Sequence, residues 1–182
     1  KKQSDIFEVV GYALPENEEE KFPKLMAAYD GYKRMTVEEI LNDPTIEAVA
    51  VETEELYLTK YALMAAKAGK HIFCEKPIDT EVAKIKEALA EVEKAGVKLQ
   101  VGFVRRFDRS HKAVRDVVAS GKLGKPYVVK VCSRDPAGPP MSYVAVSGGI
   151  FTDMMIHDFD MVRYLSGSDV VEVSATGAVL TD

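Results

Sequence analysis

The sequence predicts an α/β fold in which an incomplete Rossmann-type parallel sheet, with helices on both faces, precedes part of an α+β domain. Between residues 6 and 103, short apolar runs alternate with helix-prone segments. This alternation is typical of parallel strands that are joined by helices. After residue 103 the pattern changes to helices and a few β-rich stretches. We therefore predict two domains, at residues 1–103 and 104–182.

Four short apolar runs are the predicted strands of the first domain, and they lie at residues 6–13, 46–51, 71–74 and 97–103. The helix-prone segments beside them lie at residues 16–29, 36–42, 55–68 and 80–95. Thr36 and Glu39 have the spacing of a capping box, which marks the start of a helix. Gly69 and Gly96 stand where a helix commonly ends in the left-handed conformation.

The second domain is predicted to contain two helices and two strands. The helices lie at residues 110–119 and 150–165, the strands at residues 127–133 and 170–180, and a Pro/Gly-rich loop at residues 135–140. Gly148 and Gly149 allow a tight turn before the second helix, and Gly167 follows its end.

This second helix carries the first candidate site. At 100° per residue, Asp153, His157, Asp160 and Tyr164 fall in one narrow stripe. An Asp four residues before a His can fix the tautomer of the ring and raise its basicity, as a general base requires. An ordinary amphipathic helix with an incidental Asp/His pair is the alternative.

Composition excludes several classes of protein. The 182 residues are 47% hydrophobic and 29% charged, with a net charge of −5, as in an ordinary soluble globular protein. The acidity and the lack of a basic patch argue against nucleic acid or an anionic membrane as partner. No apolar run approaches the ~20 residues of a membrane span. Cys74 and Cys132 are too few for a disulfide framework or a zinc site, so we expect a reducing cytoplasm and no metal.

Glu75, Lys76 and Pro77 form the second candidate site, because they follow the predicted strand at residues 71–74. Ligands of open α/β sheets bind at the carboxyl ends of the strands, so Lys76 is well placed to contact one. The proline after it restrains the backbone. A surface lysine in a strand-to-helix turn is the alternative.

Four stretches together resemble the glucose–fructose oxidoreductase and inositol dehydrogenase family in their order and spacing. They are residues 71–77 (HIFCEKP), 101–108 (VGFVRRFD), 120–126 (SGKLGKP) and 148–160 (GGIFTDMMIHDFD). Residues 133–136 and 147–151 most resemble the myo-inositol 2-dehydrogenase branch of this family.

The resemblance implies an enzyme that moves a hydride between a polyol or sugar carbon, with C2 of myo-inositol as the best candidate, and NAD or NADP. It implies a nucleotide-binding first domain, a second domain for substrate binding and oligomerisation, and a homo-oligomer. The implied catalytic residues are Lys76, Asp153 and His157. Cofactor contacts are implied for Glu75, Lys76 and Pro77, and substrate contacts for Lys76, Val104, Arg105, Asp153, His157 and Asp160.

Two departures from the family limit these expectations. No G-x-G-x-x-G motif occurs, the chain opens near the family's second strand, and it stops soon after the first strands of the second domain's sheet. We therefore expect a chain that is truncated at both ends and binds a dinucleotide weakly or undetectably. Leu14 stands where the family usually has an acidic residue that holds the ribose, which leaves the choice between NAD and NADP open. A catalytically silent binding or assembly module, or a dehydrogenase of a different sugar, is the alternative.

Overall fold

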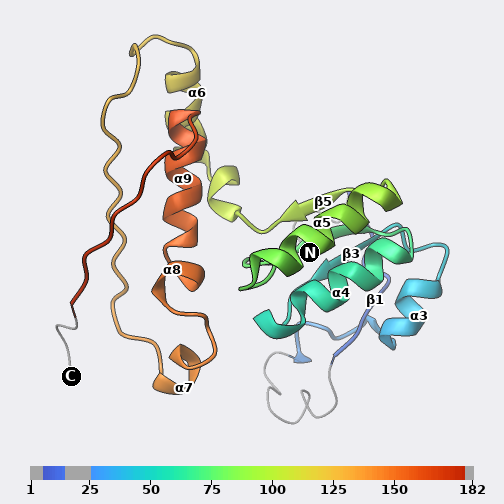
Figure 1. Cartoon of the computed structure of the whole chain (residues 1–182). Helices are drawn as coiled ribbons and strands as arrows, with labels where there is room; N and C mark the ends of the chain where they lie inside the picture. The colour runs from blue at the N-terminus through green and yellow to red at the C-terminus, as the bar shows by residue number, and fades with distance from the viewer. Residues whose placement is uncertain (1–5, 15–25, 179–182) are drawn as a thin grey trace. The chain divides into compact units, whose positions relative to one another are not determined.

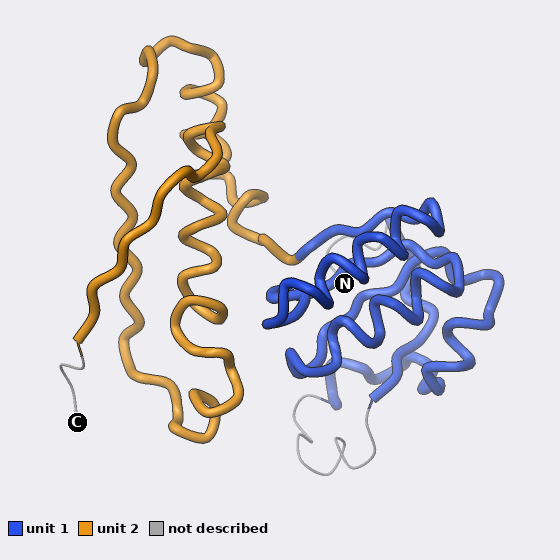
Figure 2. The backbone as a smooth tube through the Cα atoms, viewed as in Figure 1, with its two compact units in different colours: residues 1–101 blue, residues 102–182 orange. Residues whose placement is uncertain are grey.

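The structure of the chain is a computed structural model that describes residues 6–14 and 26–178. The chain divides into two compact units, residues 1–101 and 102–182 (Figure 2). Most of the predicted helix at residues 16–29 lies outside the described residues. The domain assignment at residues 1–103 and 104–182, with separate roles for the two parts, stays a prediction.

Unit 1 contains a three-stranded parallel sheet in the order β3-β4-β5. The strands are β3 (Ala48–Val51), β4 (His71–Cys74) and β5 (Leu99–Val101), and Val51 is in register with Cys74. Helix α4 (Glu55–Lys67) joins β3 to β4, and α5 (Val82–Ala95) joins β4 to β5. This arrangement confirms the predicted Rossmann-type α/β fold.

Helices α4 and α5 pack against each other and lie over the same face of this sheet (Figure 1). Alternate strand residues point toward them, because side chains alternate between the two faces of a strand. The buried cluster consists of Val51, Leu58, Ala62, Ala65, Ala66, Ile72, Cys74 and Val92. Ala48 and Ala50, on the other face of β3, are exposed. Helices on that second face stay a prediction.

A second, two-stranded parallel sheet pairs β1 (Gly11–Tyr12) with β2 (Lys33–Arg34). The strands approach closely at Gly11, where a Cβ atom would lie 2.6 Å from the carbonyl oxygen of Lys33. The prediction of a buried strand over residues 6–13 is wrong for its first part, since Ile6 and Phe7 are 74% and 53% exposed. Ile6 and Phe7 are not part of the described β1–β2 ladder, so this sheet does not bury their apolar side chains.

The helix ends in unit 1 follow local chemistry. Helix α3 (Val37–Asn42) begins with the predicted capping box, in which Thr36 Oγ1 accepts from the N–H of Glu39 at 3.1 Å and Glu39 Oε2 accepts from the N–H of Thr36 at 2.7 Å. Gly69 and Gly96, after α4 and α5, have φ of 71° and 68°, where a side chain would cause strain.

Unit 2 is built from short helices around one longer pair. The 3₁₀ helix η1 (Val104–Phe107) precedes α6 (Arg109–Ala119), and α7 (Met141–Val144) and α8 (Ile150–Asp153) precede α9 (Ile156–Ser166). Helix α9 packs against α6 and η1 (Figure 1). Asp108 Oδ1 caps α6 by accepting from the N–H groups of Ser110 and His111 at 3.0 Å each.

The strands predicted at residues 127–133 and 170–180 do not form a ladder within the described residues. Tyr127, Val128 and Val171 are 90%, 84% and 99% exposed. Apolar alternation can predict which face of a strand is buried, but a strand also needs a neighbour for its N–H and C=O groups. The predicted strand at residues 97–103 is likewise shorter, and it ends at Val101 before η1.

Candidate functional site

Lys76 lies in the loop that follows β4, at the carboxyl end of the sheet. The N–H of Glu75 donates to the carbonyl oxygen of Val51 at 3.1 Å, which extends the pairing with β3 by one residue. The carboxylate of Glu75 accepts from the N–H of Lys76 at 3.1 Å, and the peptide bond between Lys76 and Pro77 is cis. Lys76 is half-buried and Pro77 is buried. The loop therefore places a lysine at the edge where open α/β sheets bind their ligands.

Thr59 in α4 fixes this loop from the side of the helix. Its buried hydroxyl lies 2.7 Å from the carbonyl oxygen of Ile78 and 2.8 Å from Asp79 Oδ2. Burial raises the pKa of Asp79, but hydrogen bonds from the N–H of Glu81 and from Thr59 outweigh it, so the pKa is lowered. No sequence pattern points to Thr59, because its partners lie 19 and 20 residues away.

Cys74 ends β4 beside this loop. Burial, with a smaller contribution from the charge of Glu75, raises the pKa of its thiol to about 11. The thiol is therefore neutral near pH 7, as expected for a buried apolar residue rather than a nucleophile.

Asp153 and His157 lie on either side of a break between α8 and α9, and the prediction of one uninterrupted helix is wrong here. The N–H of Met155 donates to the carbonyl oxygen of Ile150 at 2.8 Å, a step of five residues instead of four. Such wide turns are frequent at functional sites. Met154 and Met155 are not helix breakers, so the sequence pattern could not show the interruption.

The turn before α8 requires its glycines. Gly148 and Gly149 have φ of 71° and 83°, and the hydroxyl of Thr152 donates back to the carbonyl oxygen of Gly148. This turn leads directly into α8, whose last residue is the half-buried Asp153. Asp153 Oδ1 accepts from the hydroxyl of Tyr143 in α7 at 2.9 Å.

His157 lies in the first turn of α9 and is also half-buried. Its ring meets the ring of Phe103 edge to face, with 6.5 Å between the centroids and 88° between the planes. The structure therefore keeps Asp153 and His157 at one helix junction. The role of each in catalysis stays a prediction.

The remaining predicted substrate residues are held by charged partners or exposed. Arg105 Nη1 lies 2.5 Å from Asp158 Oδ1, which also accepts from the hydroxyl of Ser133 at 2.8 Å. Val104 is 54% exposed. Asp160 is only 7% exposed, and both of its oxygens accept hydrogen bonds from Arg106.

Arg106 and Asp160 form an ion pair that joins η1 to α9. Arg106 Nη2 lies 2.5 Å from Asp160 Oδ1, and its Nε lies 2.8 Å from Oδ2. This hydrogen bonding raises the pKa of Arg106. Half of the predicted polar stripe, Asp160 and Tyr164, thus contacts Arg106, and substrate contact by Asp160 stays a prediction.

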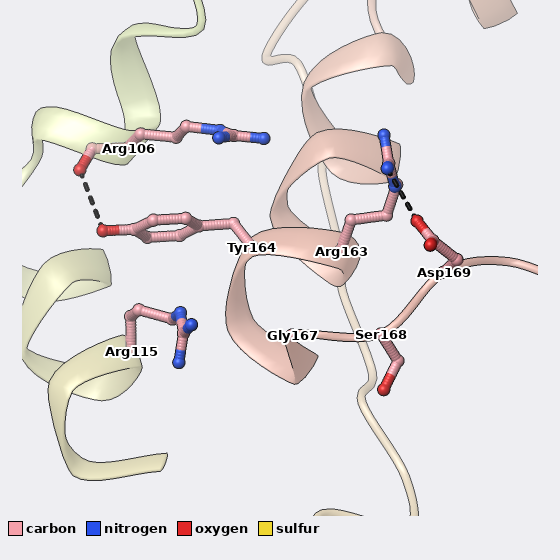
Figure 3. A pocket seen from close by; sticks show the side chains of 7 residues that line it. All are labelled: Arg106, Arg115, Arg163, Tyr164, Gly167, Ser168 and Asp169. Atoms are coloured by element: carbon pink, nitrogen blue, oxygen red, sulfur yellow. Dashed lines mark hydrogen bonds and ion pairs between the residues drawn. The ribbon is translucent and has the colours of Figure 1, made fainter. Parts of the chain in front are cut away.

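A cavity of about 420 Å³ lies near the C-terminal end of α9, and Figure 3 shows its lining. The guanidinium carbons of Arg106 and Arg115 lie 5.3 and 5.9 Å from the ring centroid of Tyr164, whose hydroxyl donates to the carbonyl oxygen of Arg106 at 3.3 Å. Arg163 pairs with Asp169 at 2.7 Å. The lining contains Tyr164 of the polar stripe but none of the predicted catalytic, cofactor-binding or substrate-binding residues, and the contacts of Tyr164 hold α9 to α6 and η1.

Residues 6–14 and 26–178 contain neither a cluster of metal ligands nor a membrane-spanning helix. No cluster of three or more His, Cys, Asp or Glu side chains there could hold a metal ion. No helix in this part of the chain is long and apolar enough to cross a membrane.

Comparison with known proteins matches nearly the whole chain to one family. Residues 2–103 match the model for the oxidoreductase family with an NAD-binding Rossmann fold, and residues 111–182 match the model for the GFO/IDH/MocA C-terminal domain. A myo-inositol 2-dehydrogenase of Thermotoga maritima is 48% identical over 144 residues, which cover 79% of this chain and 43% of that protein. The chain thus spans less than half the length of this relative.

Solved structures agree with the sequence matches. The crystal structure of a probable dehydrogenase from Thermotoga maritima has a TM-score of 0.88 at 40% identity, covering 100% of this chain and 55% of its own. Scyllo-inositol dehydrogenase from Lactobacillus casei, solved with NAD(H) and scyllo-inositol bound, has a TM-score of 0.73 at 28% identity, covering 88% of this chain and 48% of its own. With the motif around Lys76 and the turn before Asp153 both in place, the chain belongs to the GFO/IDH/MocA family of oxidoreductases.

Proposed function

We propose that the protein containing this chain is an NAD-dependent oxidoreductase that moves a hydride between a polyol carbon and nicotinamide, with C2 of myo-inositol as the first candidate. The observation that carries the proposal is the half-buried Lys76 at the carboxyl end of β4, in a loop that Thr59 fixes, within a chain that also supplies Asp153 and His157. The names of the relatives support an inositol as substrate.

The residues at the carboxyl edge of the sheet fit a nicotinamide cofactor. Lys76 offers a cationic side chain there, and Glu75 and Pro77 hold its backbone in a loop that is fixed by hydrogen bonds at both sides. When bound, the nicotinamide ring accepts the hydride. The proposed cofactor contacts of this chain are therefore Glu75, Lys76 and Pro77.

Each proposed catalytic residue has a task that suits its chemistry. The ammonium group of Lys76 binds the reacting hydroxyl and stabilises the negative charge that develops on its oxygen. A ring nitrogen of His157 takes the hydroxyl proton as the C–H bond breaks and the carbonyl forms. The carboxylate of Asp153 orients the imidazole and stabilises the positive charge that it gains. Val104 and Arg105 are proposed to contact the rest of the polyol.

The decisive assay follows NAD⁺ or NADP⁺ reduction by the complete protein, meaning this chain with any residues that precede Lys1 or follow Asp182. We expect activity with myo-inositol in a panel of cyclitols and aldoses, and a loss of about 10²-fold or more in kcat for Lys76→Ala and His157→Ala. Lys86→Ala, which removes an exposed lysine of α5, should leave kcat unchanged. Absence of reduction across the whole panel would reject the proposal. A homo-oligomer, either dimer or tetramer, and a cytoplasmic location stay predictions, and the oligomeric state can be measured by light scattering on the same sample.

A further inference from the structure

Tyr143 contacts the proposed catalytic carboxylate from outside the motif that contains it. Its hydroxyl donates to Asp153 Oδ1 at 2.9 Å across ten residues of sequence. Neither periodicity nor the family motifs singled out this tyrosine, because it belongs to a separate short helix, α7.

Helix α8 is too short to hold Asp153 in one position by itself. It has four residues, and so short a helix is not stable on its own, because its few hydrogen bonds do not offset the cost of nucleation. The break at Met155 also separates Asp153 from the continuous hydrogen bonding of α9. A tertiary contact is therefore needed to restrict the carboxylate, and the hydroxyl of Tyr143 provides one.

Tyr143 is itself tied to the loop that leads into α8. Its carbonyl oxygen accepts from the N–H groups of Val146 and Ser147 at 3.0 Å each, and Ser147 is only 3% exposed. The chain then turns through Gly148 and Gly149 into α8. The backbone of Tyr143 thus holds the start of this loop, and its side chain holds Asp153 at the end.

On the basis of the proposed function, we propose that Tyr143 is a positioning residue that acts through Asp153. A hydrogen bond from a phenol to a carboxylate is charge-assisted and stronger than one between neutral groups. By fixing Oδ1, the hydroxyl limits the rotation of the carboxylate while Asp153 supports the charge that His157 gains. Tyr143 itself touches none of the reacting atoms in this role.

The test is a double-mutant cycle in the complete protein, with myo-inositol and NAD⁺. Tyr143→Phe keeps the ring and removes only the hydroxyl, so we expect kcat to fall about 5- to 10-fold with the KM for NAD⁺ unchanged. In the Asp153→Ala background the same substitution should change kcat less than about 2-fold, since its acceptor is gone. Tyr127→Phe removes the same atom from a side chain that is 90% exposed, and it should have no effect.

Each outcome decides the proposal. An unchanged kcat for Tyr143→Phe would show that Tyr143 serves only the fold. The same conclusion would follow if Tyr143→Phe lowered kcat equally in the wild-type and Asp153→Ala backgrounds and also lowered the melting temperature equally in both. An active protein with such a result rejects the role of Tyr143 and leaves the proposed function in place. A complete protein without dehydrogenase activity rejects both.

Discussion

Replacing Arg106 by methionine should destabilise the chain by leaving Asp160 as a buried carboxylate without its cation. The side chain of Asp160 is 6% exposed, whereas that of Arg106 is 39% exposed. Removing one partner of a fully buried ion pair costs ~3–5 kcal/mol. Because water already reaches Arg106, we expect the loss of unfolding free energy to be smaller, about 2–3 kcal/mol.

Urea unfolding measures this loss. Far-UV circular dichroism is the suitable signal, because the chain has no tryptophan for fluorescence. Arg163→Met is the matched control, because its ion pair with Asp169 is 56% and 85% exposed and should contribute under about 1 kcal/mol. The double variant Arg106→Met/Asp160→Leu, which removes both charges, should recover at least about 1 kcal/mol of the loss. If Arg106→Met costs no more than Arg163→Met, the proposed role of this buried pair is wrong.

Three further predictions concern unit 1 and the cofactor. Gly11→Ala should lower the free energy of unfolding by about 1–3 kcal/mol, since the new Cβ would lie 2.6 Å from the carbonyl oxygen of Lys33. Gly138→Ala is the control and should not lower it, because no atom lies within 4 Å of the new Cβ. Equal shifts in the melting temperature of the two variants would contradict this prediction. At pH 8 iodoacetamide should label the exposed Cys132 and spare Cys74, whose buried thiol has a pKa of about 11; peptide mass spectrometry showing equal labelling would refute it. Calorimetry of NADH with the 182-residue chain should detect no micromolar binding, because the chain contains no glycine-rich phosphate turn, and a measured micromolar Kd would overturn that expectation.

Features set by local chemistry could be predicted from the sequence. The capping box at Thr36 and the glycines after α4 and α5 lie where the pattern placed them, because each depends on neighbouring residues alone. Strand β4 also has its predicted bounds, and its neighbours β3 and β5 lie in other predicted strands. Strand β2 could not be found in this way. Lys33 and Arg34 carry no apolar signal, and only the pairing with Gly11 and Tyr12 makes them a strand.

Features that depend on distant partners could not be predicted. A strand is expected at residues 127–133, which are rich in valine, but no described residue pairs with it in a ladder. The candidate residues Lys76, Asp153 and His157 came from motifs, whereas their supports did not. Thr59 and Tyr143 reach the Lys76 loop and Asp153 only through the fold, so a single sequence gives no sign of them.

In the proposed reaction, the complete protein removes a hydride from the carbon that bears the reacting hydroxyl of a cyclitol. Incubation with NAD⁺ and myo-inositol that carries deuterium at C2 tests it, with mass spectrometry of the reduced cofactor as the measurement. We expect deuterium in the nicotinamide ring of the reduced cofactor. The Lys76→Ala variant should form almost none of this deuterated product. Reduced cofactor without deuterium would place the reaction at another carbon, and the absence of reduced cofactor with every cyclitol would reject the proposed reaction.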